Sequence, residues 1–487
     1  MAWTMRSSTK GNGTLVIAAS VATAMVAAHY VLVWSIRRRE EQESKCPPWA
    51  PAGIGETIQE ISGSNYPWFM LRMAKEAKSF TFRVNLPIIG TPMVVAVGDV
   101  ETHRAVLTHR ATERPIELMY KTFDNVTCGV PSIFTSNGEY WHKRRKLIAP
   151  AFEKSHVMRM NAVALAKTEE WIETQLRPMV QKGEAFDVGH EMVGMILSAL
   201  CETAFEFQLS QEDQTQYRED LEICLREFLF KSTTNPFRAL LGSLIPERRR
   251  AYQAAERLMG LAKKVMENYR ALPAPLKDTI IDRVMNSGVY ASEREIQSDI
   301  VFLLLAGHET TGYSIAWTLI ELARNQEHLK AVRQAVARLR SEEYHSCSAL
   351  QNVIKEAMRL HPVAAAGSFR VLGENMETKE GYLLPVGTIV FLPLILLLRN
   401  PSVFENPDQF QPSRWEHATP KMTDSFLPFS LGKQNCVGQA LAKIELDTVI
   451  ARIISEFDLS VADEGVTDYF LTMKPIGAKL LATKANV

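Results

Sequence analysis

The chain has 487 residues, of which 46% are hydrophobic and 23% are charged, a globular composition with ample length for a large core. Its 55 basic and 55 acidic residues give a formal net charge of zero, which argues against an electrostatic nucleic-acid-binding protein. The six cysteines are scattered and form no C-x-x-C pair. This spacing argues against a disulfide framework and a structural zinc site, and it indicates a reducing compartment for the main body.

An apolar segment near the amino terminus predicts a membrane anchor. Residues 14–36 contain no Asp, Glu, Lys or Arg and are long enough to cross a bilayer as one helix. We therefore predict a tail over residues 1–13, a transmembrane helix over 14–36 and a basic, proline-rich linker over 37–53. Because Lys and Arg favour the cytoplasmic side, the body is expected there. A cleaved signal or organelle presequence is the alternative, since the first acidic residue is Glu40.

The remainder, residues 54–487, is predicted to be one large domain, mainly α with small β-sheets, because no linker-like break divides it. Short apolar runs predict strands near residues 93–97 and 387–394, and a hairpin is expected over 468–481. Helical periodicity predicts helices over residues 160–176, 188–207, 211–230, 248–269, 293–325, 349–360 and 437–456.

The long helix predicted in the middle of the chain carries polar groups in apolar surroundings. Ser292 and Glu295 form a capping-box pattern at its start, and a hydrophobic run precedes the segment AGHETTG at residues 306–312. A buried acid and buried hydroxyls are costly unless they are hydrogen-bonded. Thr310 can donate to the carbonyl of Ala306 and bend the helix, which opens a groove for a small ligand. Taken alone, the segment is more simply explained as a satisfied helix kink.

Cys436 is the most informative residue, because it lies in the sequence FSLGKQNCVG (residues 429–438) directly before a helix. Gly432 and Gly438 permit a tight loop around it, and Phe429 can pack against a flat surface. A sulfur at a helix N-terminus meets oriented N–H groups, which favour the thiolate. A rigidly held thiolate beside a flat partner is what a thiolate-ligated haem requires.

These motifs resemble those of the cytochrome P450 family, the haem-thiolate monooxygenases, over roughly residues 50–480. The Cys436 loop resembles F-x-x-G-x-R-x-C-x-G, and the segment that begins at Ala306 resembles A-G-x-(D/E)-T-(T/S). The resemblance implies the cytochrome P450 fold, Cys436 as the axial ligand of haem b (iron protoporphyrin IX), and Glu309 and Thr310 as an acid–alcohol pair that relays protons. Some fatty-acid hydroxylases of the family have a glutamate in place of Ala306 that esterifies the haem, so we expect non-covalent haem here.

A second pair of motifs implies a structural support behind the haem. Glu356 and Arg359 match E-x-x-R, and their i, i+3 spacing places both charges on one helix face. Arg414 falls in a segment that resembles F-x-P-x-R. By resemblance the three form a buried triad, in which losing one member would strand the others. The alternative for any such pair is a solvated surface bridge of little energetic value.

Several polar residues are expected to hold the haem propionates by the same resemblance. Trp141 and Arg145 match W-x-x-x-R, and Arg370 lies where relatives often place another propionate arginine. The usual Arg or His two residues before the cysteine is Gln434 here. Since a neutral hydrogen bond is weaker than a charge-assisted one, the clamp is expected to depend more on Arg145 and Arg370.

The resemblance implies a monooxygenase that inserts one oxygen atom from O2 into an apolar substrate, such as a sterol, fatty acid, terpenoid or xenobiotic. Electrons would come from NADPH through a separate NADPH–cytochrome P450 reductase. The basic cluster at residues 142–146 is either a docking surface for that donor or a solvated helix face. The expected location is the endoplasmic reticulum membrane with the catalytic domain in the cytosol, and a plastid or mitochondrial membrane is the alternative.

Two other functions stay open at this point. One is an O2-independent haem isomerase or dehydratase that acts on a hydroperoxide, which the presence of Glu309 and Thr310 disfavours. The other is a non-catalytic haem carrier or gas sensor. By family position, the substrate pocket is expected to include residues 119–130, Phe302, Leu305, residues 363–367 and residues 471–472.

Overall fold

The structure is a computed structural model that describes residues 45–62, 65–85, 93–232, 235 and 237–485. Its elements are mainly helices with small sheets, which confirms the predicted fold class. The predicted tail and transmembrane helix lie outside the described residues. Within the described ranges, none of the helices combines the length and the apolar character needed to span a bilayer.

Helices form most of the described chain. The α-helices are α2 (Ile54–Ser62), α3 (Tyr66–Ala77), α4 (Val100–Thr108), α5 (Gly138–Ile148), α6 (Lys154–Trp171), α7 (Arg177–Lys182), α8 (Val188–Phe205), α9 (Gln211–Leu225), α11 (Phe237–Leu241), α12 (Pro246–Ala271), α13 (Ile280–Asn286), α14 (Glu293–Arg324), α15 (Gln326–Val336), α16 (Ser348–Leu360), α17 (Leu394–Leu398), α18 (Pro420–Ser425) and α19 (Gln439–Glu456). The short 3-10 and π segments are η1 (Ile116–Tyr120), η2 (Lys121–Thr127), η3 (Ala149–Phe152), η4 (Ile172–Leu176), η5 (Arg226–Lys231), η6 (Gly242–Leu244), η7 (Ser341–Ser346) and η8 (Pro412–Trp415).

The strands form four small sheets in the described part of the chain, in the orders β1-β2-β8-β5-β3, β4-β12-β9, β10-β11 and β6-β7. Their bounds are β1 (Thr81–Arg83), β2 (Val94–Val97), β3 (Thr112–Glu113), β4 (Phe186–Asp187), β5 (Ser368–Leu372), β6 (Met376–Glu377), β7 (Leu383–Leu384), β8 (Ile389–Leu392), β9 (Phe457–Asp463), β10 (Val466–Phe470), β11 (Thr472–Ile476) and β12 (Lys479–Lys484). In the largest sheet β2 and β8 run parallel and the other neighbours are antiparallel.

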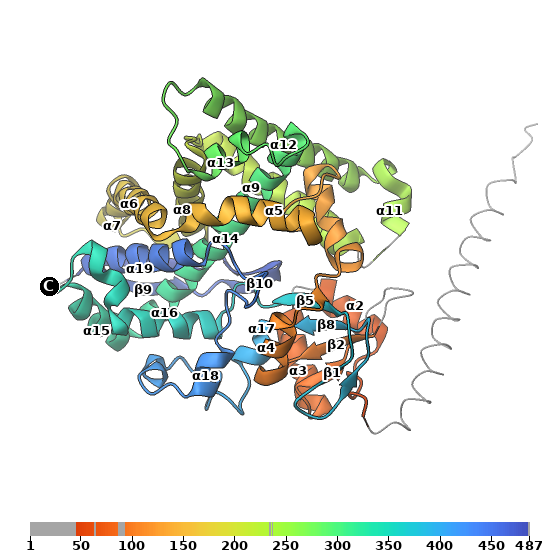
Figure 1. Ribbon diagram of the computed structural model, residues 1–487. Helices are drawn as coiled ribbons and strands as arrows, with labels where there is room; N and C mark the ends of the chain where they lie inside the picture. The colour runs from red at the N-terminus through yellow and green to blue at the C-terminus, as the bar shows by residue number, and fades with distance from the viewer. Residues whose placement is uncertain (1–44, 63–64, 86–92, 233–234, 236, 486–487) are drawn as a thin grey trace, which may run out of the picture.

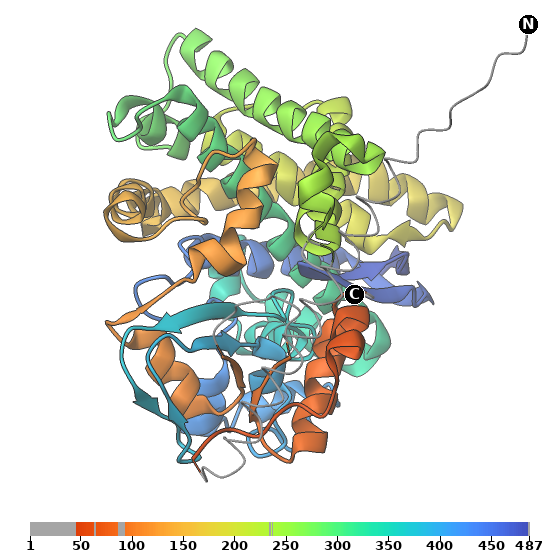
Figure 2. The ribbon, with the colours of Figure 1, turned by 90° about the vertical axis from the view of Figure 1, so that its right-hand side faces the viewer.

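Helix α14 crosses the middle of the molecule, with α9, α12 and α13 on one side and the five-stranded sheet toward the other end (Figure 1). The view from the side shows the same division into a helical part and a part that contains the sheet (Figure 2). Helix α14 packs against α8, α12, α16 and α19, and most of its residues are buried. This burial explains why it is hydrophobic on nearly every face.

The helix predicted over 211–230 is confirmed, as α9 up to Leu225 and the π segment η5 after it. Two other predictions about local structure need correction. The predicted hairpin over 468–481 is instead β10–β11, whereas β12 leaves through Gly477 (φ 71°) and pairs with β4 and β9. Ser292 is the N-cap of α14 but makes no capping hydrogen bond with its side chain. Glu295 accepts from Arg144 at 2.7 Å instead of closing a capping box.

Candidate active site

The loop before α19 holds Cys436 in a fixed position. The Cys436 amide donates to the carbonyl of Phe429 at 2.9 Å and closes the loop. Gly432 has a φ of 77°, and a Cβ built there would lie 2.3 Å from the carbonyl oxygen of Leu107. Only glycine fits this position, because both the backbone conformation and the contact with α4 exclude a side chain. Gly438 is the N-cap of α19, so Cys436 lies two residues before the cap.

In the chain alone, the environment of the Cys436 sulfur favours the thiol, whereas the sequence predicts a preference for the thiolate. The side chain is exposed, yet protein atoms surround it closely, as expected for a residue that faces a hollow. Burial is the largest effect and raises the pKa of the Cys436 thiol, while the Gly438 N–H and the charge of Arg145 lower it by less. A metal cation at the sulfur would reverse this balance, because the ligating form is the thiolate.

Three arginines near this loop have no carboxylate partner within the described residues. Arg145 donates twice to Asn435, at 2.8 and 2.7 Å, whereas Arg114 and Arg370 donate to backbone carbonyls. The pKa of Arg114 is lowered to about 10, mainly by burial and also by the charges of Arg370 and Arg145. Buried cations that lack an anion are costly, so the cluster fits a ligand with carboxylate groups.

Trp141 and Gln434 lie at the edge of the same cluster. The ring of Trp141 is buried, and the guanidinium carbon of Arg114 lies 6.0 Å from its centroid. Gln434 donates through Nε2 to Oδ1 of Asn137 at 3.2 Å, and its Oε1 is buried without a partner. The structure thus brings together the residues that the sequence predicts as propionate contacts and places Arg114 beside them. No motif marks Arg114 in the sequence, so it was missed.

The polar segment of α14 differs from the expected acid–alcohol pair. Thr310 Oγ1 donates to the carbonyl of Ala306 at 2.8 Å, as the sequence predicts. Ala306 is exposed although its neighbours in the helix are mostly buried, which leaves an open space beside this turn. The Glu309 carboxylate points elsewhere, because it accepts from Thr472 at 2.9 Å and from Lys474 at 3.0 Å. The structure therefore does not place the Glu309 and Thr310 side chains together.

His308, next to the acid, has a packing role. Its Nδ1 lies 2.6 Å from the carbonyl oxygen of Leu304, so this nitrogen carries the proton and donates. Burial lowers the pKa of His308 to about 4, which keeps the ring neutral at physiological pH. The ring packs edge-on against Tyr217, with centroids 5.6 Å apart.

The predicted triad is formed and fully enclosed. Glu356 accepts from Arg359 at 2.8 Å and from Arg414 at 2.9 Å, and both Glu356 and Arg359 are completely buried. Trp415 also donates to Glu356, at 2.9 Å, a contact that the sequence did not suggest. This network connects α16 to the η8 segment and excludes the surface-bridge alternative.

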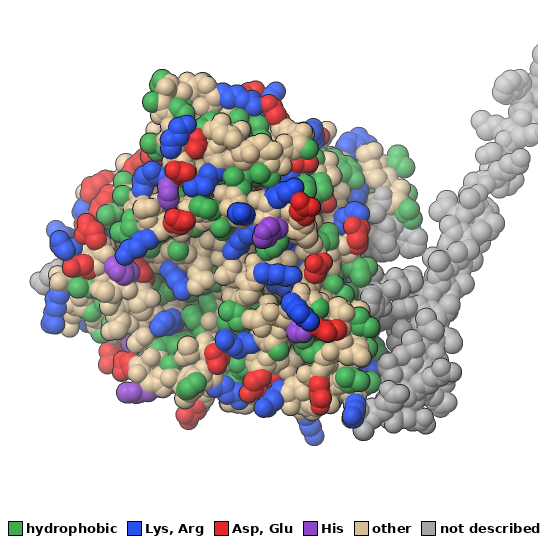
Figure 3. Space-filling view, in the orientation of Figure 1, with side chains coloured by type: hydrophobic (Ala, Val, Ile, Leu, Met, Phe, Trp, Pro, Cys, Tyr) green, Lys and Arg blue, Asp and Glu red, His purple; other side chains and the backbone are tan. Residues whose placement is uncertain are grey.

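The basic cluster at residues 142–146 is not one solvated face. Arg144 is buried and pairs with Glu295 at 2.7 Å and Asp299 at 3.2 Å, both on α14. Arg145 binds Asn435, so only three of the five basic side chains remain at the surface. The reason is that successive helical residues point about 100° apart, so one run of charges faces several neighbours. Figure 3 shows basic and acidic side chains interspersed on the visible face rather than segregated by sign.

Segments expected to line the substrate pocket contact one another in two pairs. The ring of Phe302 on α14 stacks with that of Phe134, with centroids 5.6 Å apart, and its centroid lies 6.3 Å from that of Phe123 on η2. On another side, the Met473 amide donates to the carbonyl of Val363 at 2.8 Å, which connects β11 to the 363–367 segment. The residues that meet here are aromatic or aliphatic, as an apolar ligand requires.

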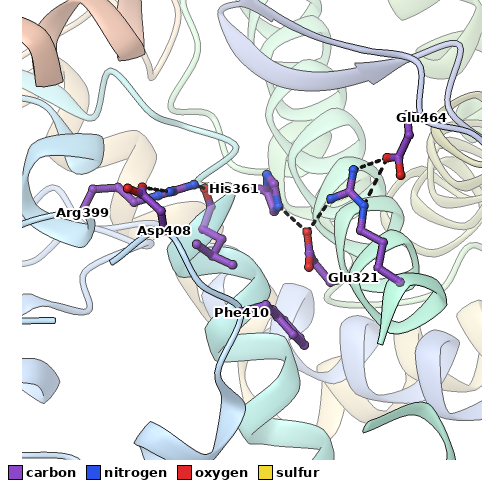
Figure 4. Close-up of a pocket in the computed structure, with 8 residues that line it drawn as sticks. Glu321, His361, Arg399, Asp408, Phe410 and Glu464 are labelled. Carbon is purple, nitrogen blue, oxygen red and sulfur yellow. Dashed lines mark hydrogen bonds and ion pairs between the residues drawn. The ribbon is translucent and has the colours of Figure 1, made fainter. Parts of the chain in front are cut away.

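A separate pocket of about 390 Å³ lies at the end of α14 (Figure 4). Glu321 accepts from His361 at 2.9 Å and from Arg324 at 2.7 Å, and Arg324 also pairs with Glu464. The His361 ring stacks on Trp317 with centroids 4.0 Å apart. The Glu321–His361 hydrogen bond connects α14 to the end of α16, and the Arg324–Glu464 ion pair connects α14 to the residue after β9. The sequence did not predict these contacts.

The cytochrome P450 family profile matches residues 65–482. The chain is 25% identical to a protein named taurochenodeoxycholic 6 alpha-hydroxylase from Sus scrofa, over 76% of this chain and 77% of that protein. It is 27% identical to probable cytochrome P450 4s3 from Drosophila melanogaster, over 83% of this chain and 84% of that protein. Since the family match spans both the helical fold and the Cys436 loop, the chain belongs to the cytochrome P450 family and is a haem monooxygenase.

Proposed function

We propose that Cys436 is the axial thiolate ligand of non-covalently bound haem b, and that the chain oxygenates an apolar substrate. The observation that carries this proposal is the cluster of Arg114, Arg145 and Arg370, which lies beside the Cys436 loop without a carboxylate in the described residues. Haem b offers two propionates to such a cluster, and with a thiolate ligand it supplies O2 activation, in which one oxygen atom enters the substrate and the other leaves as water.

The residues around the loop would hold the cofactor by distinct means. The three arginines would donate charge-assisted hydrogen bonds to the propionates, and Trp141 and Gln434 would add neutral ones. The Cys436 loop would stay flat and close to the porphyrin because of Phe429, Gly432 and Gly438. The small side chain of Ala306 would leave room above it and offers no carboxylate for an ester bond.

Protons would reach the pocket through α14. The Thr310 hydroxyl can bind a water molecule beside Ala306 and pass a proton to it, as a general acid working through water. Glu309 would take up a proton from water once its carboxylate leaves Lys474, because burial then favours the acid, and would pass this proton on toward Thr310. Burial of the surrounding apolar residues would exclude bulk water from this step.

The substrate class is a sterol, fatty acid, terpenoid or related apolar molecule, which the aromatic and aliphatic lining around Phe302 supports. The relative named taurochenodeoxycholic 6 alpha-hydroxylase is consistent with an apolar skeleton as substrate. We further propose that NADPH supplies electrons through a separate reductase. Residues 14–36 would anchor the catalytic domain, residues 54–487, to the endoplasmic reticulum membrane or to an organelle membrane.

The test is the absorption spectrum of reduced, CO-treated holoprotein. The wild type should show the band of thiolate ligation, and Cys436→His should lose it. A nitrogen-type spectrum in the wild type would overturn the proposal. A library of lipids should then be screened for compounds that shift the haem absorption band. NADPH and reductase should support product formation from those compounds. Turnover of a hydroperoxide alone, without NADPH, would favour an isomerase or dehydratase instead.

A further inference from the structure

The β10–β11 hairpin connects the expected substrate pocket to α14. Its tip is Leu471, which has a φ of 60° and lies in a predicted pocket segment. One residue of β11, Met473, bonds in both directions: its amide donates to Val363 at 2.8 Å, and its carbonyl accepts from Trp317 of α14 at 3.0 Å. Beside the tip, Phe470 packs on Phe230 with ring centroids 4.4 Å apart. A ligand that displaces this tip would therefore also move β11.

The hairpin also holds the acid of α14. Lys474 Nζ lies 3.0 Å from Oε1 of Glu309, and Thr472 donates to Oε2 at 2.9 Å. The side chains of Lys474 and Glu309 are only 7% and 9% exposed. Both oxygens of the carboxylate are thus occupied by donors from β11. Because Glu309 and Thr310 are consecutive on the helix, the carboxylate cannot keep these bonds and also reach toward Thr310.

The charges around Glu309 make Lys474 its main counter-ion. Burial is the largest effect and raises the pKa of Glu309, but Lys474 and then His308 lower it, so the net direction is downward. Removing Lys474 would leave burial dominant and favour the protonated acid. The titratable and charged groups around the Lys474–Glu309 pair are His308 and Tyr313 on α14 and Tyr217, Arg218 and Glu222 on α9.

We propose that Lys474 is a positioning residue for Glu309: it holds the carboxylate ionised against β11, so that displacement of the hairpin by substrate frees this acid to turn toward Thr310. The inference rests on the proposed function, because it concerns when protons reach the oxygen site. In this proposal, β11 controls when Glu309 supplies protons, and the Glu309–Thr310 motif alone gives no such control.

The first test measures the charge of Glu309 directly and needs no substrate. Infrared titration of the ferric holoprotein should show no protonated carboxyl band from Glu309 at neutral pH in the wild type. Lys474→Met should show such a band, which the added Glu309→Gln change removes. Lys474→Arg should match the wild type, as should Lys479→Met, which alters an exposed lysine on β12. A Lys474→Met protein without the band would overturn the proposal.

The second test measures proton supply with NADPH and reductase, with and without lauric acid as the probe. Lys474→Met frees Glu309 before substrate binds, so hydrogen peroxide formation without lauric acid should rise roughly tenfold over the wild type, below the about 10²–10⁴-fold that a general acid contributes. Lys474→Arg should keep substrate-free peroxide formation at the wild-type level. If Lys474→Met fails to retain haem, Thr472→Val should shift peroxide yield in the same direction, and an unchanged yield would overturn the proposal. A wild type that lacks the thiolate spectrum would refute the proposed function itself, which separates the two failures.

Discussion

Replacing Glu356 by alanine tests whether the buried triad supports the fold. Its carboxylate accepts hydrogen bonds from Arg359, Arg414, Trp415 and the Gln411 amide, all within 3.0 Å. Removing one partner of a buried ion pair costs about 3–5 kcal/mol, and here two guanidinium groups lose the same anion. We therefore expect a loss near the upper end of that range, which is a large part of a typical stability of about 5–15 kcal/mol.

The assay is urea unfolding of the holoprotein, with the haem absorption and the far-UV circular dichroism as independent probes. Glu356→Gln should cost less than alanine, because it keeps one carbonyl acceptor and the shape of the side chain. Glu416→Ala, an exposed acid next to Trp415, serves as the matched control and should change little. A Glu356→Ala protein within about 1 kcal/mol of the wild type would refute the reasoning that this triad is a buried and essential support.

Four further changes follow from the site and its neighbour. Gly432→Ala should abolish the thiolate spectrum, because its Cβ would meet the Leu107 carbonyl at 2.3 Å, whereas Gly260→Ala, with nothing within 4 Å, should leave the spectrum intact. Arg114→Met should speed haem transfer to an apo-globin by roughly tenfold to a hundredfold, since a hydrogen bond to a charged group contributes about 1.5–3 kcal/mol. Gln434→Arg should slow that transfer, and faster transfer would contradict a propionate contact. Burial lowers the pKa of His361 below 6.5 in the folded protein. As the pH falls, His361 therefore becomes protonated in the unfolded chain before it does in the folded protein, and the folded protein loses stability. His361→Asn should therefore flatten the pH dependence of the urea midpoint between about pH 7 and pH 5, and an unchanged slope would exclude this histidine as its source.

The sequence predicts those features that depend on local pattern. Apolar periodicity and end signals locate α14 and α16 within one or two residues of their bounds, because the signals act within one helical turn. The glycines of the Cys436 loop predict its tight path for the same reason. Glu356 and Arg359 share a face by spacing alone, but Arg414 joins them only through the family resemblance, since it lies 58 residues from Glu356.

Side-chain direction and long-range pairing are what local pattern does not determine. Lys474 lies 165 residues after Glu309, and neither residue has a signal that names the other. Arg144 belongs to an apparent surface cluster, yet the helix turns it toward Asp299, 155 residues away. Arg114 belongs to no motif, and it becomes a candidate contact only because the fold brings it near Arg145 and Arg370. Such positions follow from the packing of whole elements, which requires the three-dimensional structure.

The same arginine cluster links cofactor binding to stability. Burying Arg114 and Arg370 without an anion lowers their pKa values and costs free energy in the chain alone. Two propionates would remove that cost, so part of the affinity for haem would come from relief of repulsion rather than from new contacts. A ligand that binds only the folded state stabilises it by mass action. Arg114→Met should therefore weaken haem retention strongly. The haem-free protein should lose less stability than the loss of three hydrogen bonds to backbone carbonyls predicts, because the variant also removes one unpaired cation. A haem-free protein that loses as much stability as the holoprotein would instead identify Arg114 as a support of the fold.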